Sequence, residues 1–280
     1  MINLNSYQDD AFDFYKSVVS SKQNSPQDPH YLDRIDSLES VVKDQYNAHT
    51  IHFQGDTLEL LSNHAMSVAS MNDLRKLYAY QNSVLQDLRV KLTTTNTGRM
   101  VICQSCTLNN ANSFDHYISK GEFPEFAVNP INLIPCCSEC NSLKSSQWRG
   151  IHGRNILNHY LDILPQVQYL YVDLGIGNKA IEVKFYLDNS NGVNNLLFER
   201  INNHYTRLEL FRRFQENSES VISSLKDDIE NGLVDSNFDL VRTQVLRRID
   251  REKATKGVNY WQSVLKHTLI NDEDFIIDYI

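Results

Sequence analysis

The sequence predicts an α+β protein with a cysteine-rich centre. Three observations support this class: apolar residues recur at helical spacing over residues 1–92, all five cysteines lie between Cys103 and Cys140, and residues 167–187 alternate as a β-hairpin does before a helical tail. A chain of 280 residues is long enough for two modest domains, or for one core with an appendage. We therefore expect a helical region over 1–92, a core over 99–150, and a hairpin with helices over 151–280.

The N-terminal region is predicted to be mostly helical. Residues 11–19 predict a short helix, which two prolines and small polar residues over 20–30 interrupt. Two apolar stripes at helical spacing follow: Leu32, Ile35, Leu38, Val42 and Tyr46, and then Leu74, Leu77, Tyr78, Leu85, Leu88 and Leu92. The run TTTNTG, residues 93–98, is typical of a linker to the core.

The C-terminal region is predicted to hold one hairpin among helices. Apolar residues over 156–164 favour a helix that ends at Pro165. The GIGNKA stretch, residues 175–180, has the spacing of a loose dinucleotide-binding pattern, but a strand-like segment follows it, so we interpret it as the hairpin turn. Further helices are expected over residues 199–215, 218–232, 239–256 and 259–269.

Composition and charge exclude several classes of protein. The 27 Lys and Arg residues and 35 Asp and Glu residues give a net charge of −8, so any surface that binds nucleic acid must be a local patch. No apolar run approaches the roughly 18 residues that cross a bilayer, and residues 1–14 do not resemble a secretory signal. We therefore expect a cytoplasmic protein without membrane contacts, whose thiols stay reduced.

The cysteines form two CxxC pairs, Cys103 with Cys106 and Cys137 with Cys140. Each pair places two thiolates on one side of a metal ion, and two pairs complete the tetrahedral Cys₄ site that Zn²⁺ prefers. The alternative is a buried or redox-active pair of thiols. Cys136 adjoins a ligand and is interpreted as a bystander thiol.

A second set of polar residues lies between the two pairs and directly after the second pair. Asp115 and His116 are expected on a strand, where their side chains point to opposite faces. Asn141 follows the second pair, near the start of a predicted helix over 140–149. Oxygen ligands from Asp115 and Asn141 suit Mg²⁺ or Mn²⁺, and a neutral His116 can take a proton from an attacking water.

Residues 99–150 resemble the HNH endonucleases, also called His-Me finger or ββα-metal nucleases, that carry a structural zinc. The order CxxC, DH and NPxNLxPCCxxCNxxK carries the resemblance. It implies a ββα-metal nuclease core with Zn²⁺ on the four paired cysteines. It also implies that Asp115 and Asn141 bind the catalytic cation and that His116 is the general base.

The resemblance implies roles for two further residues. Asn132 would orient the His116 ring by a hydrogen bond, and Lys144 would lie near the scissile phosphate or support the site. Many members carry proline where this chain has Ser119, a position that shapes a loop. His159-Tyr160-Leu161-Asp162 and Tyr260-Trp261 are similar to flanks of stand-alone bacterial HNH proteins.

The expected activity is metal-dependent hydrolysis of DNA, in bacterial defence against phage or foreign DNA. Two alternatives remain open: a nuclease subunit that is active only in a larger complex, for example with an ATPase, and a degenerate zinc-stapled module that binds nucleic acid or protein. The retention of Asp115, His116 and Asn141 favours an active enzyme.

A basic segment over residues 247–256 is the candidate surface for DNA. It holds five Lys or Arg residues against two acidic residues, whereas the core over 99–150 has no net charge. Arg247, Arg248 and Arg251 are the candidate contacts with phosphate. The alternative is a solvated helix face with local ion pairs.

Overall fold

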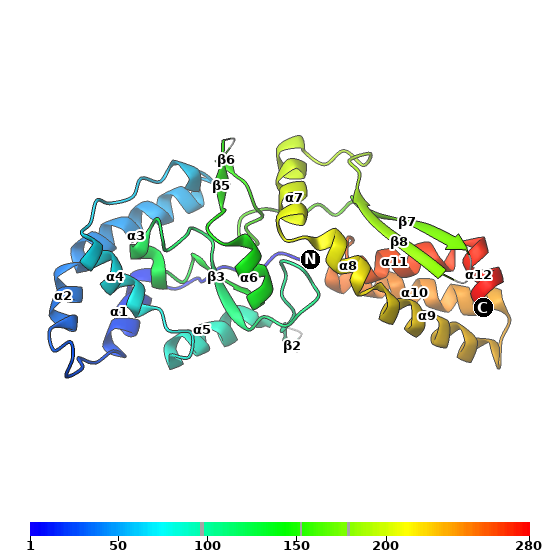
Figure 1. Ribbon diagram of the computed structural model, residues 1–280, viewed down its shortest axis with the longest axis horizontal. Coiled ribbons are helices and arrows are strands. Elements are labelled where there is room, and N and C mark those ends of the chain that lie inside the picture. The colour runs from blue at the N-terminus through cyan, green and yellow to red at the C-terminus, as the bar shows by residue number, and fades with distance from the viewer. Residues whose placement is uncertain (96–97, 152, 178–179) are drawn as a thin grey trace. The chain divides into compact units, whose positions relative to one another are not determined.

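The computed structural model describes residues 1–95, 98–151, 153–177 and 180–280 (Figure 1). It shows helices together with small antiparallel sheets, and it confirms the predicted α+β class. The chain divides into two compact units, one formed mainly by residues 3–163 and the other mainly by residues 164–280. We call them the N-terminal unit and the C-terminal unit.

The N-terminal unit begins with the predicted helices. They are α1 (Ala11–Ser20), α2 (Tyr31–Ser37), α3 (Glu39–Gln54), α4 (Val68–Leu77) and α5 (Ser83–Thr93), with a 3₁₀ turn η1 (Leu58–Leu60). The Asp10 carboxylate begins α1 by accepting the backbone N–H groups of Phe12 and Asp13 at 2.8 Å. The apolar stripe over 32–46 is divided at Leu38 between two helices, α2 and α3, which bury Ile35 and Val42.

The described residues of the linker expected over 93–98 belong to the end of α5 and to two short strands. The short strands β1 (Thr94–Thr95) and β2 (Gly98–Arg99) pair with each other, and residues 96–97 lie outside the described part of the chain. A second short pair, β5 (Arg149–Gly150) and β6 (Gly153–Arg154), follows the core.

The core of the N-terminal unit is a ββα arrangement. Strand β3 (Ser113–His116) pairs antiparallel with β4 (Leu133–Cys136), and helix α6 (Ser138–Lys144) follows β4 directly. A 3₁₀ segment η2 (Pro124–Val128) lies between the strands in sequence and packs on α3 and α4. The helix expected over 140–149 begins earlier and ends earlier, because the Cys137 thiol accepts the N–H of Cys140 and Ser145 leaves the helical conformation with φ of 54°.

The C-terminal unit contains the predicted hairpin and helices. Strands β7 (Leu170–Gly177) and β8 (Ala180–Leu187) pair in register, and the tip residues 178–179 lie outside the described part of the chain. The helices are α7 (Asn195–Arg207), α8 (Leu210–Glu216), α9 (Ser218–Leu233), α10 (Phe238–Lys256), α11 (Trp261–Ile270) and α12 (Glu273–Tyr279). Trp261 stacks on Phe214 in the core of this unit, with ring centroids 5.2 Å apart.

Two helix predictions over residues 151–280 are wrong. Residues 156–164 form turns, because the Asn158 side chain accepts the N–H of Tyr160 and the Asp162 carboxylate accepts the N–H of Asn158. The helix expected over 199–215 is broken at Glu209, whose φ of 52° separates α7 from α8.

Candidate active site and metal centre

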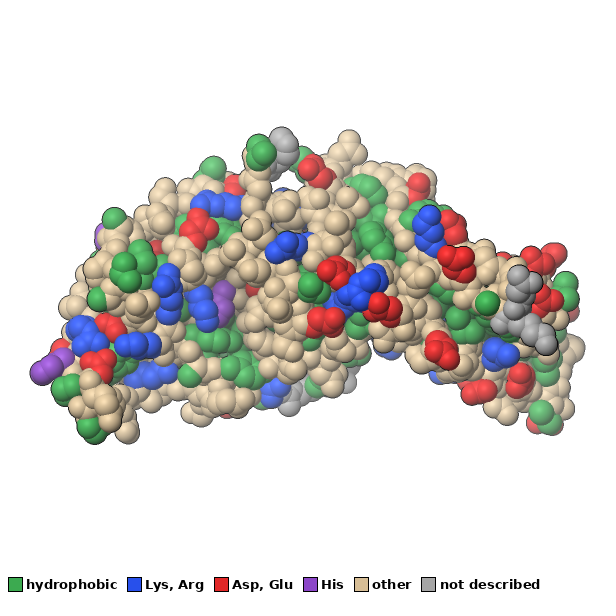
Figure 2. Space-filling view, in the orientation of Figure 1, with side chains coloured by type: hydrophobic (Ala, Val, Ile, Leu, Met, Phe, Trp, Pro, Cys, Tyr) green, Lys and Arg blue, Asp and Glu red, His purple; other side chains and the backbone are tan. Residues whose placement is uncertain are grey.

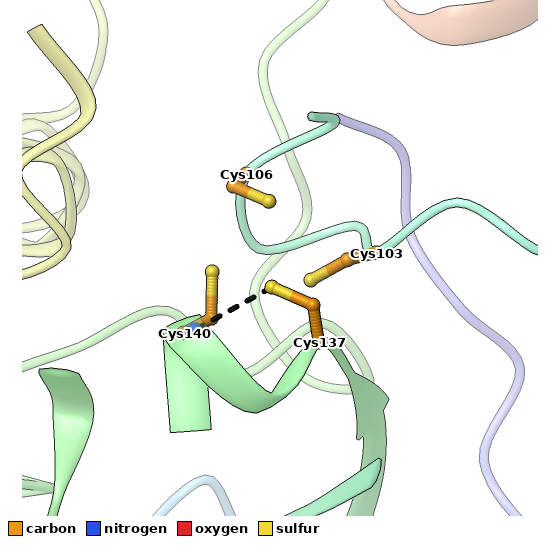
Figure 3. A group of neighbouring side chains, drawn as sticks. All are labelled: Cys103, Cys106, Cys137 and Cys140. Carbon is orange, nitrogen blue, oxygen red and sulfur yellow. Dashed lines mark hydrogen bonds between the residues drawn. The ribbon is translucent and has the colours of Figure 1, made fainter. Parts of the chain in front are cut away.

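Four cysteines form a cluster that could hold a metal ion. The Sγ atoms of Cys103, Cys106, Cys137 and Cys140 all lie within 4.8 Å of one another, and all four residues are buried. Figure 3 shows the four thiols pointing toward one another, with Cys103 and Cys106 on a loop and Cys137 and Cys140 at the start of α6. The two CxxC pairs are therefore brought together as their spacing predicts.

The local backbone of each pair suits a thiolate. The N–H of Cys140 donates to Sγ of Cys137 and the N–H of Leu108 donates to Sγ of Cys106, both at 3.4 Å. Such bonds stabilise negative charge on sulfur. A tetrahedral Zn²⁺ with Zn–S bonds of about 2.3 Å requires sulfurs about 3.8 Å apart, which this cluster accommodates. Cys136 is not a member of the cluster, and burial raises the pKa of its thiol well above the ordinary value.

Strand β3 brings Asp115 and His116 to a cleft of about 390 Å³ in the N-terminal unit. Asn141 of α6 also lines this cleft, so the three residues expected at the catalytic centre meet in one place. The remaining lining residues are Tyr78, Tyr80, Asn112, Ser113, Phe114, Ser119, Lys120, Ser138 and Ser145.

Asp115 is held by Lys144. The Lys144 ammonium lies 2.9 Å from Oδ1 of Asp115 and donates to the backbone oxygens of His116 and Tyr117 at 3.0 Å. Burial raises the pKa of Asp115, and the Lys144 charge opposes that rise. Lys144 is itself buried, and its hydrogen bonds fix the position of the carboxylate and of the end of β3.

His116 is held in one tautomer. Its Nε2 lies 2.8 Å from the carbonyl oxygen of Ala127, and because a carbonyl only accepts, Nε2 must carry the proton. Nδ1 is then the nitrogen with a free lone pair, and it has no hydrogen-bond partner among the described residues. Burial, with the nearby Lys120 charge, lowers the pKa of His116 to about 3, so the ring is neutral at pH 7.

Asn132 does not hold the ring as the resemblance implied. Its Oδ1 accepts the N–H of Ile118 at 2.8 Å, and its Nδ2 donates to the carbonyl oxygen of Ile118 at 3.0 Å. Asn132 therefore fixes the loop that follows β3, and the direct contact with His116 comes from Ala127. A backbone carbonyl has no signature in sequence, so no motif could have indicated this contact.

Asn141 is oriented by the strand. Its Nδ2 donates to Oγ of Ser113 at 3.1 Å and to the carbonyl oxygen of Phe114 at 3.2 Å. With Nδ2 committed to β3, the amide oxygen is the atom left for a ligand. A carboxylate from Asp115 and an amide oxygen from Asn141 in a cleft open to water form a donor set that fits a hard divalent cation.

Sequence reasoning missed the contribution of the N-terminal helices. Tyr78, which directly follows α4, lies edge-to-face on His116 with ring centroids 4.5 Å apart, and Lys120 covers the same tyrosine. From its spacing alone, Tyr78 belongs to an apolar helical stripe. Its proximity to His116 is a tertiary contact between residues 38 positions apart in the sequence, so no local pattern indicates it.

The three candidate arginines lie on the exposed face of α10 in the C-terminal unit. Arg248 contacts Asp228 of α9 at 2.6 Å and Glu252 at 3.9 Å. Arg247 and Arg251 form no ion pair with any described residue, and Nε of Arg251 donates to the carbonyl oxygen of Arg247.

Comparisons with known proteins give one distant relative. Protein ea31 of Escherichia phage lambda is 23% identical over 187 residues, which cover 62% of this chain and 62% of that protein. The chain thus covers less than two thirds of the relative's length. No family model matches the chain, and no solved structure matches it. None of the helices in the described residues is long and apolar enough to cross a bilayer.

Proposed function

We propose that this chain is a metal-dependent endonuclease that hydrolyses DNA phosphodiester bonds. The observation that supports it best is the cleft in which a neutral His116, with Nδ1 unpartnered among the described residues, meets Asp115 and Asn141 on a ββα arrangement beside four clustered cysteines. DNA as the substrate rests on the resemblance of residues 99–150 to HNH nucleases.

The proposed step begins with a water molecule near Nδ1 of His116. As the water oxygen forms a bond to phosphorus, His116 takes a proton from it, and the ester bond to the leaving oxygen breaks. The Ala127 carbonyl then stabilises the imidazolium, because it already accepts the Nε2 proton. A phosphate bound beside the ring adds negative charge, which raises the pKa of His116 from its low value in the free protein.

Two metal ions would serve different purposes. Zn²⁺ on the four cysteines would fix the loop of Cys103 and Cys106 to the start of α6. Mg²⁺ or Mn²⁺ would be held by the Asp115 carboxylate and the Asn141 amide oxygen. When bound, that ion supplies positive charge that stabilises the developing phosphorane.

We further propose a cytoplasmic role in defence against phage or foreign DNA, alone or with a protein partner such as an ATPase. This rests on the resemblance to stand-alone bacterial HNH proteins.

The deciding experiment is cleavage of supercoiled plasmid with Mg²⁺, Mn²⁺ or EDTA. We expect nicked or linear products with a divalent cation, and a loss of about 10² to 10⁴ in rate for His116→Ala and His116→Gln. Their circular dichroism and zinc content should match the parent. Equal cleavage by these variants contradicts the proposal, whereas tight DNA binding without cleavage, with or without partner proteins, favours a binding module.

A further inference from the structure

Lys120 lines the cleft beside the candidate general base, and a second cation, Arg75, holds its backbone. The Lys120 ammonium, on the loop after β3, lies 4.5 Å from the centre of the Tyr78 ring. The same ring packs against His116, with centroids 4.5 Å apart. One aromatic side chain therefore contacts both the candidate general base and a lysine, and Lys120 lines the cleft together with His116.

Arg75 of α4 holds the loop that carries Lys120. Its Nε donates to the carbonyl oxygen of Lys120 at 3.0 Å, and its Nη2 donates to the carbonyl oxygen of Gly121 at 2.8 Å. These two bonds fix the backbone of the loop and bring a second positive charge beside the first. Arg75 and Lys120 lie 45 residues apart in sequence, so the tertiary fold brings them together.

The charges of these two residues are not neutralised within the described structure. Neither Arg75 nor Lys120 forms an ion pair with a described carboxylate, although the chain carries a net charge of −8. The neighbouring Lys76 differs, because it contacts Asp73 at 3.2 Å and Asp28 at 3.7 Å. Burial and the Arg75 charge lower the pKa of Lys120, as expected for two cations held together without an anion.

Figure 2 shows Lys and Arg side chains gathered over α2 and α4, interspersed with Asp and Glu. Within this mixed surface, Lys120 at the cleft and the adjacent Arg75 are cations that form no ion pair with a described carboxylate, and the acceptors that Arg75 contacts are uncharged. The chemistry that satisfies two adjacent cations beside a candidate hydrolytic histidine is a phosphate group.

We propose that Lys120 and Arg75 form a phosphate-binding subsite for the backbone of the nucleic acid. Tyr78 positions the Lys120 ammonium by a cation–π contact, and Arg75 positions its backbone. The N-terminal helices thus complete the substrate site instead of serving only as a scaffold. This inference rests on the proposed function, because it assumes that the substrate is a phosphodiester.

The test measures DNA binding over a salt series in the Asp115→Asn background, in which the amide oxygen still accepts from Lys144. Lys120→Gln and Arg75→Gln should each flatten the plot of log affinity against log salt by about 0.9 for duplex DNA. Lys120→Arg should restore the slope. Lys76→Gln is the matched control, since it removes an equal charge that is already paired, and it should leave the slope unchanged.

The outcomes separate the two proposals. A parent that binds DNA with the same slope as Lys120→Gln contradicts the subsite and leaves the nuclease proposal intact. An equal loss of slope in Lys76→Gln also contradicts it, because the effect would then follow from net charge alone. A parent that does not bind DNA at low salt contradicts both proposals.

Discussion

The Asp115 carboxylate has two roles, pairing with Lys144 and binding a cation, and the choice of substitution decides which of them is tested. One oxygen is committed to Lys144, and the carboxylate lines the cleft where a cation would bind. Asp115→Ala would leave the Lys144 charge buried without its carboxylate partner, at a cost of about 3–5 kcal/mol, so loss of activity would be uninformative. Asp115→Asn also removes the negative charge, but its amide oxygen can still accept a hydrogen bond from Lys144, so we expect it to destabilise the fold less.

We therefore expect Asp115→Asn and Asn141→Ala to raise the Mg²⁺ concentration needed for half-maximal cleavage, or to abolish cleavage, without releasing zinc. The physical reason is that oxygen ligands hold the catalytic cation separately from the thiolates. Titration of the cation during plasmid cleavage, with metal analysis of each variant, measures both quantities. Zinc loss in either variant would show that the two sites have been assigned incorrectly.

A buried histidine away from the cleft gives a prediction for stability. His49 of α3 is 1% exposed and packs on Phe126, with ring centroids 4.9 Å apart. Burial lowers its pKa from 6.5 to about 3, so the unfolded chain binds a proton in that range and the folded chain does not. The contribution of neutral His49 to the free energy of unfolding is fully present above pH 6.5 and is lost as the pH falls toward 3.

His49→Leu should therefore reduce the loss of stability on acidification. Between pH 7 and pH 5, the free energy of unfolding of the variant should fall by about 2 kcal/mol less than that of the parent. Denaturant titrations at the two pH values measure this difference, and His30→Leu, at an exposed histidine, is the control. Parallel pH profiles for parent and His49→Leu would mean that His49 is protonated in the folded state.

At the scale of elements, the sequence predicted what local spacing encodes. The two CxxC pairs predict four clustered thiols, and the structure brings the four together. The alternation over 167–187 predicts a hairpin, which is also present. The helix breaks at Leu38 and Glu209 could not be predicted, because neither position carries glycine or proline. Glu209 adopts φ of 52° without any signal in its residue type.

In the candidate site too, residues that lie close together in sequence could be predicted, whereas those that arrive by tertiary contacts could not. Asp115, His116 and Asn141 lie within one segment of the sequence, and all three line one cleft. Tertiary contacts bring Tyr78 and the carbonyl of Ala127 to His116, and Arg75 to the loop of Lys120. The residue types at these positions do not indicate such a role.

The fold around the two CxxC pairs is predicted to depend on a bound metal ion. Cys103→Ser and Cys140→Ser should each lose zinc and unfold the core, because zinc binding at structural sites contributes folding free energy of about 10–16 kcal/mol. Cys136→Ser removes a buried thiol outside the cluster, and should keep its zinc and its thermal unfolding transition. Metal analysis and circular dichroism of the three variants measure the effect. Equal damage from Cys136→Ser would contradict the ligand set.

For the whole molecule, a net charge of −8 means that DNA must be attracted by local groups. Helix α10 offers fewer free charges than its sequence suggests. Arg248 is paired with Asp228 at 2.6 Å. The candidate contacts Arg247 and Arg251 are exposed and form no ion pair with a described residue, so their charges remain available to phosphate.

Replacing both Arg247 and Arg251 with Gln should weaken binding of the Asp115→Asn protein to duplex DNA. The slope of log affinity against log salt should fall by about 0.9 for each contact with phosphate that is lost. Arg212→Gln is the control, because Arg212 is also exposed but pairs with Glu216 at 2.6 Å. If the double variant keeps the slope and affinity of its parent while Lys120→Gln does not, DNA is captured at the cleft alone, and the basic face of α10 serves packing or another protein.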